Sequence, residues 1–269
     1  MESEIKYSLE AAYQKASRIL QHDSIKETGF VDLYGSENVV KDTELASHIK
    51  TKQEQRDTPE AKESAKLASV LEAIIHTQVN NSKWFGNYAK SIKAPQYDDL
   101  INGVDTVIEF KVPQIPTHYL AMGIDVTYRI NLEKKFERIK QEIDDGQLAT
   151  IKYLRSSDGT MRAEKTQVPR LVIGVDGQTC QSLAKAWYEE APGLKTNPVK
   201  FQIIKELHMQ LVAFEQYARK TGKKDIAEKY KESLSVVEPL LREVEKQYHF
   251  KNEVGDRSTT HIEEALREF

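Results

Sequence analysis

Two neighbouring segments in the middle of the chain are rich in β-branched and aromatic residues, and a break that contains prolines separates them. The first, VDTVIEFKV, covers residues 104–112, and the second, YLAMGIDVTYR, covers residues 119–129. Such segments favour β-strands, whereas the prolines of the break at 113–117 cannot continue a strand ladder. The pattern therefore predicts two adjacent strands joined by a turn, with a sheet at the centre of the fold.

Segments of helical period lie on both sides of this region. Before it, the sequence Asp57-Thr58-Pro59-Glu60 is typical of a helix start, and an apolar stripe follows over 67–79. After it, apolar residues recur at helical spacing over 132–143, 203–214 and 226–248. We therefore expect an α/β fold in which helices flank the sheet and the last two helices form an antiparallel hairpin.

Three further strands are expected at 88–93, 148–154 and 171–175, which gives a mixed central sheet of about five strands. The predicted organisation has four parts: an N-terminal helical region at 1–57, an α/β core at 58–192, a C-terminal helical hairpin at 193–251 and a polar tail at 252–269.

Composition narrows the class of protein. The 269 residues carry a net charge of -3, which argues against a chain that coats nucleic acid by bulk charge. Cys180 is the single cysteine, so an internal disulfide framework and a cysteine-based zinc cage are excluded. The N-terminus lacks the layout of a secretory signal, and the apolar runs are shorter than the ~20 residues that span a bilayer. We expect a soluble, cytoplasmic protein without membrane contact.

Each of the two central segments carries one aspartate inside its apolar run. If the break turns about Ile115, residues equidistant from it face each other, and Asp105 lies directly opposite Asp125. Directly opposed side chains have Cβ atoms ~5 Å apart, so two carboxylates there repel unless a cation lies between them. We predict a Mg²⁺ or Mn²⁺ site held by these two acids. The other interpretation is that each aspartate is exposed or pairs with a lysine. A slip of the strand register by one residue would also place the two aspartates on opposite faces of the sheet.

The acids and the order of elements resemble the PD-(D/E)xK nuclease superfamily, over roughly the middle half of the chain. The resemblance implies a helix, a three-stranded meander, a second helix and a further strand. It implies that Asp105 is the metal-binding acid of the second strand. Asp125-Val126-Thr127 then stands at the position of the D/E-x-K tripeptide on the third strand.

Thr127 departs from the family pattern, which has a lysine at that position. The resemblance then implies either that Lys135 or Lys134 on the following helix takes the role of this lysine, or that the site is weakened. It also implies that Glu72 on the first helix lies near the metal and takes part in catalysis.

A second register is open. Glu109-Phe110-Lys111 is a literal E-x-K with Asp99 upstream, and Asn102-Gly103 would then form a type I′ hairpin turn. At ~3.4 Å per residue, Lys111 lies about 20 Å from Asp105, so it cannot serve a site that contains that aspartate. We favour the first register over this one.

The function that the resemblance implies is a metal-dependent nuclease, which hydrolyses phosphodiester bonds in DNA or RNA with Mg²⁺ or Mn²⁺. Lys134 and Arg138 would contact the phosphate backbone, unless that helix face is simply solvated and paired with glutamates. The alternative is a catalytically inactive nuclease-like fold that binds nucleic acid or a protein. The C-terminal hairpin offers a further surface for a partner or for a second copy in a homodimer.

Overall fold

In the computed structural model of the chain, residues 2–114, 117–126, 130–247 and 257–269 are described, and for residues 2–8, 121–126, 130–132, 247 and 257–258 the backbone alone is described. The helices are α1 (Glu2–Asp23), α2 (Val31–Tyr34), α3 (Ser36–Arg56), α4 (Pro59–Ser82), α5 (Gln96–Leu100), α6 (Ile130–Asp145), α7 (Gly177–Tyr188), α8 (Val199–Lys220), α9 (Lys224–Gln247) and α10 (Arg257–Leu266), with short 3₁₀ helices η1 (Glu27–Phe30) and η2 (Pro192–Thr196). The strands are β1 (Ala89–Lys93), β2 (Thr106–Phe110), β3 (His118–Val126), β4 (Ala149–Arg155), β5 (Arg162–Val168) and β6 (Arg170–Val175).

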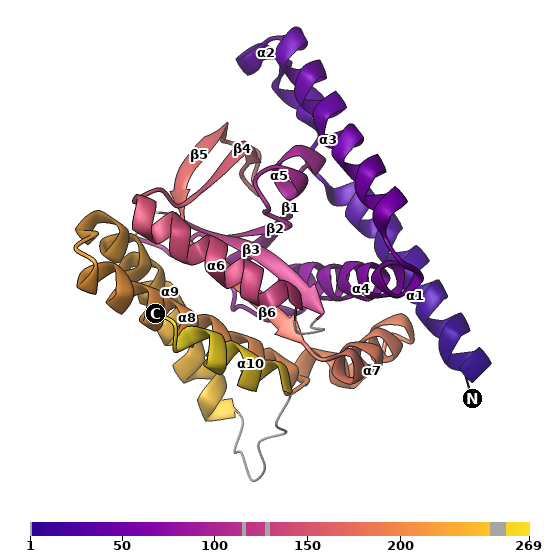
Figure 1. The fold of residues 1–269 in the computed structure, drawn as a ribbon. Coiled ribbons are helices and arrows are strands. Elements are labelled where there is room, and N and C mark those ends of the chain that lie inside the picture. The colour runs from indigo at the N-terminus through magenta and orange to yellow at the C-terminus, as the bar shows by residue number, and fades with distance from the viewer. Residues whose placement is uncertain (1, 115–116, 127–129, 248–256) are drawn as a thin grey trace.

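The main sheet has the strand order β1-β2-β3-β6 (Figure 1). Strand β2 pairs antiparallel with both β1 and β3, and β6 pairs parallel to β3. Strands β4 and β5 form a separate antiparallel pair. The expected mixed α/β fold is confirmed, but a single sheet of about five strands is not. The reason is β5, a mostly polar and exposed strand that draws β4 into its own hairpin.

The register of the central hairpin differs from the sequence prediction. Strand β2 pairs with β3 so that the register, continued by one residue, places Asp105 opposite Gly123. The predicted direct opposition of Asp105 and Asp125 is therefore wrong by two residues. The connection turns about Gln114, which has a left-handed φ of 67°, rather than about Ile115. Because the shift is two residues, the alternation of the strands stays in phase and the two positions are diagonal neighbours.

Helix α4 connects the N-terminal helices to the sheet. As predicted, Thr58 caps it by accepting a hydrogen bond from the backbone N–H of Ala61, and Pro59 occupies its first turn. Its apolar stripe is buried against β1 and β3, with α1 and α7 packed on its outer side. The helix thus fixes the side chains of its inner face against β1.

The C-terminal helices cover another part of the sheet. Helices α8 and α9 form the expected antiparallel hairpin, joined at Thr221-Gly222, and they lie with α10 at the end of the molecule away from α1–α3 (Figure 1). Residues 257–266 of the expected polar tail form α10, on which Ile262 is fully buried against the core. The boundaries of the four predicted parts stay a prediction.

Both outer strands of the main sheet receive hydrogen bonds from a side-chain amide. On β1, the Asn80 amide donates to the carbonyl of Ser91 and accepts from its N–H, both at 3.0 Å. On β6, the Gln210 amide of α8 does the same with Val172, both at 2.8 Å. Each amide thereby takes the place of one residue of a neighbouring strand.

Within the part of the chain that the structure describes, every helix is too short or too polar to cross a membrane.

Candidate functional site

The inner face of α4 carries a polar stripe along its contact with β1. Glu72, His76 and Asn80 follow one another at intervals of four residues, so they lie on one face of the helix. They meet Ser91 and Lys93, which share one face of β1. Buried polar side chains cost stability unless each finds a partner. A largely buried polar stripe in an otherwise apolar interface is therefore the first candidate for chemistry.

Lys93 lies at the centre of an acid cluster at one end of this stripe. Its Nζ lies 2.9 Å from Oε1 of Glu72 and 2.9 Å from Oδ2 of Asp99. It also donates to the main-chain carbonyl of Asp105 at 2.9 Å. The Thr106 hydroxyl donates to Glu72 at 3.0 Å. We call Glu72, Lys93, Asp99 and Asp105 the acid cluster.

The charges of the acid cluster do not balance, because three carboxylates surround one ammonium group. Burial raises the pKa of Glu72 to about 7, and the neighbouring Asp105 and Asp99 add to this while Lys93 opposes it. Burial also raises the pKa of Asp99, and a hydrogen bond with Asp105 acts in the same direction. Burial disfavours the charged form of Lys93, but the three carboxylates outweigh it and raise its pKa. A surplus of negative charge is left that a proton or a second cation would neutralise.

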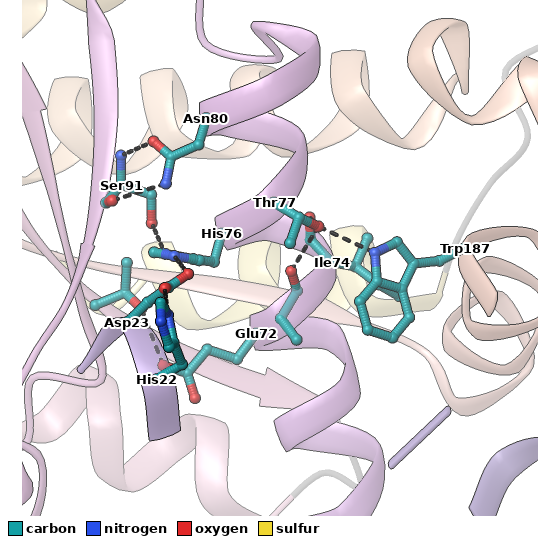
Figure 2. A network of polar contacts seen from close by, with 11 residues as sticks. His22, Asp23, Glu72, Ile74, His76, Thr77, Asn80, Ser91 and Trp187 are labelled. Carbon is teal, nitrogen blue, oxygen red and sulfur yellow. Dashed lines mark hydrogen bonds and ion pairs between the residues drawn. The ribbon is translucent and has the colours of Figure 1, made fainter. Parts of the chain in front are cut away.

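His76 lies one helical turn from Glu72 and joins two other elements (Figure 2). Its Nε2 lies 3.1 Å from Oδ2 of Asp23 at the end of α1, and its Nδ1 lies 2.9 Å from the Ser91 hydroxyl. These partners fit a neutral imidazole that donates from Nε2 and accepts at Nδ1. Burial lowers the pKa of His76, and the contact with Asp23 opposes this shift.

Of the residues predicted for the favoured register, the structure brings Glu72 and Asp105 together. Glu72 reaches the cluster from α4, and Asp105 lies one residue before β2. The backbone of Asp125 is on β3 opposite Gly174 of β6, and its side chain lies outside the described part of the chain. Thr127 also lies outside the described residues.

The second register does not hold together. Asp99 joins the acid cluster, but from helix α5 and not from a strand, so the predicted turn at Asn102-Gly103 with a strand before it is wrong. Glu109 is fully buried near the other end of β2, where it accepts from the Tyr119 hydroxyl at 3.1 Å. Lys111 lies 3.5 Å from Glu109 and pairs with Asp158 at 2.6 Å. Glu109 and Lys111 thus belong to a separate, internally paired network.

The basic residues predicted on the following helix have different surroundings. Lys134 is exposed and Lys135 is half-buried near the start of α6. The Arg138 guanidinium donates to the carbonyl of Asn102 at 2.8 Å and lies 3.4 Å from Glu142. Arg138 therefore ties α6 to the segment after α5. Its predicted role in contacting nucleic acid stays a prediction, as do those of the two lysines.

Sequence reasoning missed Lys93, the one cation of the cluster. A signal was present, because the stripe Glu72, His76 and Asn80 on a predicted helix needs polar partners, and the predicted strand at 88–93 offers Ser91 and Lys93 at alternate positions. The family resemblance implies a lysine on the third strand or on the helix after it, whereas Lys93 comes from the first strand.

Among the side chains that the structure describes, no group of three or more histidine, cysteine, aspartate or glutamate residues is arranged to hold a metal ion. That set does not include the side chain of Asp125. Scans against models of protein families, curated proteins and solved structures found no match to this chain.

Proposed function

We propose that this protein is a metal-dependent phosphodiesterase that acts on DNA or RNA, with the acid cluster as its site. The observation that carries the proposal is the surplus of charge: three carboxylates face one ammonium group. When the three carboxylates and the ammonium group are all ionised, their surplus of two negative charges equals in size the charge of one divalent cation. Oxygen ligands from carboxylates are those that Mg²⁺ and Mn²⁺ prefer.

The order of elements supports the proposal. Helix α4, the three antiparallel strands β1, β2 and β3, helix α6 and the parallel strand β6 follow the sequence that the resemblance implies. In this arrangement Glu72 comes from the first helix and Asp105 from the start of the second strand. Asp125 comes from the third strand. These three positions come from three elements that meet at one end of β2.

The chemistry assigns a role to each group of the site. Glu72, Asp99, Asp105 and Asp125 would hold the cation, which when bound supplies Lewis acidity and lowers the pKa of a water molecule. Lys93 would hold the attacking water or stabilise the negative charge that develops on the phosphoryl oxygens. The hydroxyl of Thr106 orients Glu72.

The test measures Mn²⁺ binding by calorimetry and cleavage of labelled DNA and RNA, with wild type and Asp105→Asn side by side. We expect wild type to bind Mn²⁺ and cleave, and Asp105→Asn to lose both. Glu137→Gln is a matched control, because it removes one carboxylate from an exposed position on α6. If Asp105→Asn binds Mn²⁺ and cleaves like wild type, the site is wrong.

The second candidate is a catalytically inactive nuclease-like fold that binds nucleic acid. The observation that favours it is the pairing of Lys93 with both Glu72 and Asp99, since a fixed ammonium group then neutralises part of the charge without a metal. Such a protein would bind an oligonucleotide and leave it intact with every divalent cation tested.

A further inference from the structure

A polar cavity of about 930 Å³ is lined by part of the polar stripe, at His76, Asn80 and Ser91. Its wall is formed by the end of α1, helix η1 with the residues just before it, residues 90–92 of β1 and the turn between β4 and β5. His76, Asn80 and Ser91 belong to this wall and also to the polar stripe of α4 and β1. The stripe therefore connects the cavity to the acid cluster, over a single turn of α4 between His76 and Glu72.

The two carboxylates of the cavity wall already have partners. Asp23 contacts both His22 and His76, and Asp158 pairs with Lys111 at 2.6 Å. The hydrogen bond from Lys111, followed by those from Thr160 and Ser156, lowers the pKa of Asp158. Both acids are thus ionised at neutral pH and are engaged within the protein.

Three cations of the wall, Lys26, Lys90 and Arg155, have no acidic partner among the described residues, and Lys26 donates to the carbonyl of Gln21 at 2.7 Å. Lys90 projects from β1 into the wall beside Lys83, and burial together with this like charge lowers its pKa. The Arg155 guanidinium lies over Gly159, where a Cβ would approach it to 3.5 Å. By contrast, Arg162 is held by Asp32 at 2.6 Å. Lys90 and Arg155, both at exposed positions, are therefore the cations of the described wall that have neither an acidic partner nor a carbonyl acceptor within the protein.

Both cations line the same cavity, so an anion that enters it meets their positive charge. Arginine binds a phosphate group through two parallel hydrogen bonds, and lysine binds it as a point charge. A volume of about 930 Å³ is at the upper end for sites of small molecules, so it admits a nucleotide-sized group and not a duplex.

We propose that this cavity binds a phosphate group of a single nucleic-acid strand, through Lys90 and Arg155. This rests on the proposed function, because a strand that enters the cavity presents its neighbouring phosphodiester to the acid cluster one helical turn away. The substrate is then single-stranded, and its anchor lies on β1 and at the end of β4.

The test measures binding separately from cleavage. A fluorescein-labelled single-stranded oligonucleotide is titrated with protein in EDTA, where no metal supports turnover, and its anisotropy is followed at several salt concentrations. The variant is Lys90→Gln/Arg155→Gln. The matched control is Lys231→Gln/Arg242→Gln, which removes one lysine and one arginine from exposed positions on α9.

We expect the variant to bind at least about tenfold more weakly than wild type at low salt, and the control to bind like wild type. The slope of log K against log salt falls by about 0.7 in the variant, because the contact with one phosphate group is lost on a single strand. If the variant binds the oligonucleotide as tightly as wild type does, the proposal is wrong. It is also wrong if wild type binds no oligonucleotide.

Competition identifies the source of the phosphate group. If inorganic phosphate displaces the oligonucleotide only at far higher concentration, the strand is the ligand, as proposed. If inorganic phosphate binds as tightly as the oligonucleotide, the cavity serves a free anion and the strand is excluded. A wild type that binds the oligonucleotide and does not cleave it with Mn²⁺ refutes the proposed function and leaves the assignment of this cavity intact.

Discussion

The amino group of Lys93 lies 2.9 Å from Oε1 of Glu72, and both side chains are nearly buried, with exposed fractions of 10% and 11%. The contact joins the first strand of the main sheet to the helix that packs on it. Because Asp99 and Asp105 share the same ammonium group, this pair has more negative than positive charge around it. Its behaviour on substitution and with pH follows from that imbalance.

Replacing Lys93 with methionine should destabilise the protein. The change leaves buried carboxylates without their cation, and loss of one partner of a buried pair typically costs about 3–5 kcal/mol. Urea unfolding at pH 8 should show this decrease in the free energy of unfolding. The decrease should be smaller at pH 5, where Glu72 is protonated. Lys62→Met, at an exposed position on α4, serves as the control. An equal stability of Lys93→Met and wild type would show that the cluster is hydrated and weakly coupled.

Without metal, the contribution of Glu72 to the free energy of unfolding should fall as pH rises from about 4.5 to about 7. The pKa of Glu72 is about 7 in the folded protein and close to 4.5 when unfolded, so the native state binds more protons in this window. The raised pKa of Asp99 acts in the same direction. Urea unfolding at intervals of pH should give a decline of about 1–3 kcal/mol. Glu72→Gln should flatten it, and an unchanged profile in that variant would contradict the assignment.

In the presence of EDTA, the free energy of unfolding of Asp105→Asn should equal or exceed that of wild type. The substitution removes one of three neighbouring negative charges and keeps a group that can accept a hydrogen bond, a gain of about 0–1 kcal/mol. Mn²⁺ should raise the melting temperature of wild type and leave that of the variant unchanged, because only the native wild type binds it. A variant less stable than wild type in EDTA would point to a structural role for Asp105.

His76 should titrate below its ordinary pKa of 6.5, because burial disfavours the imidazolium. Its folded pKa is lowered, so its contribution to stability is present above pH 6.5 and is lost as the pH falls to the folded value. Imidazole resonances followed by NMR should show this. In Asp23→Asn the pKa should drop further, since Asp23 favours the charged form. Asp158→Asn, elsewhere in the cavity wall, is the control, and equal shifts in both variants would refute the role of Asp23.

The strongly patterned elements could be predicted from the sequence. Helix α4 was predicted because Thr58 and Pro59 mark its start and a long apolar stripe follows. Strands β2 and β3 were predicted because β-branched and aromatic residues dominate them. These signals are local, so they need no knowledge of the rest of the chain.

The missed features depend on distant contacts. The register between β2 and β3 is set by the conformation of Gln114, which composition does not reveal. Strand β5 is polar and exists because β4 offers it a partner. Asp99 reaches the acid cluster because helix α5 turns the chain between β1 and β2, and Lys93 reaches it through the packing of α4 on β1. Sequence spacing alone could therefore place neither Asp99 nor Lys93 in the acid cluster.

The amides of Asn80 and Gln210 have a consequence for association. An outer strand with open N–H and C=O groups is a template for another strand, and such pairing leads to edge-to-edge assembly or aggregation. At Ser91 and at Val172 those groups are already bound by a side chain of the same molecule. Two copies of this protein would therefore have to break those bonds to merge their sheets at these positions, which favours an interface built from helices.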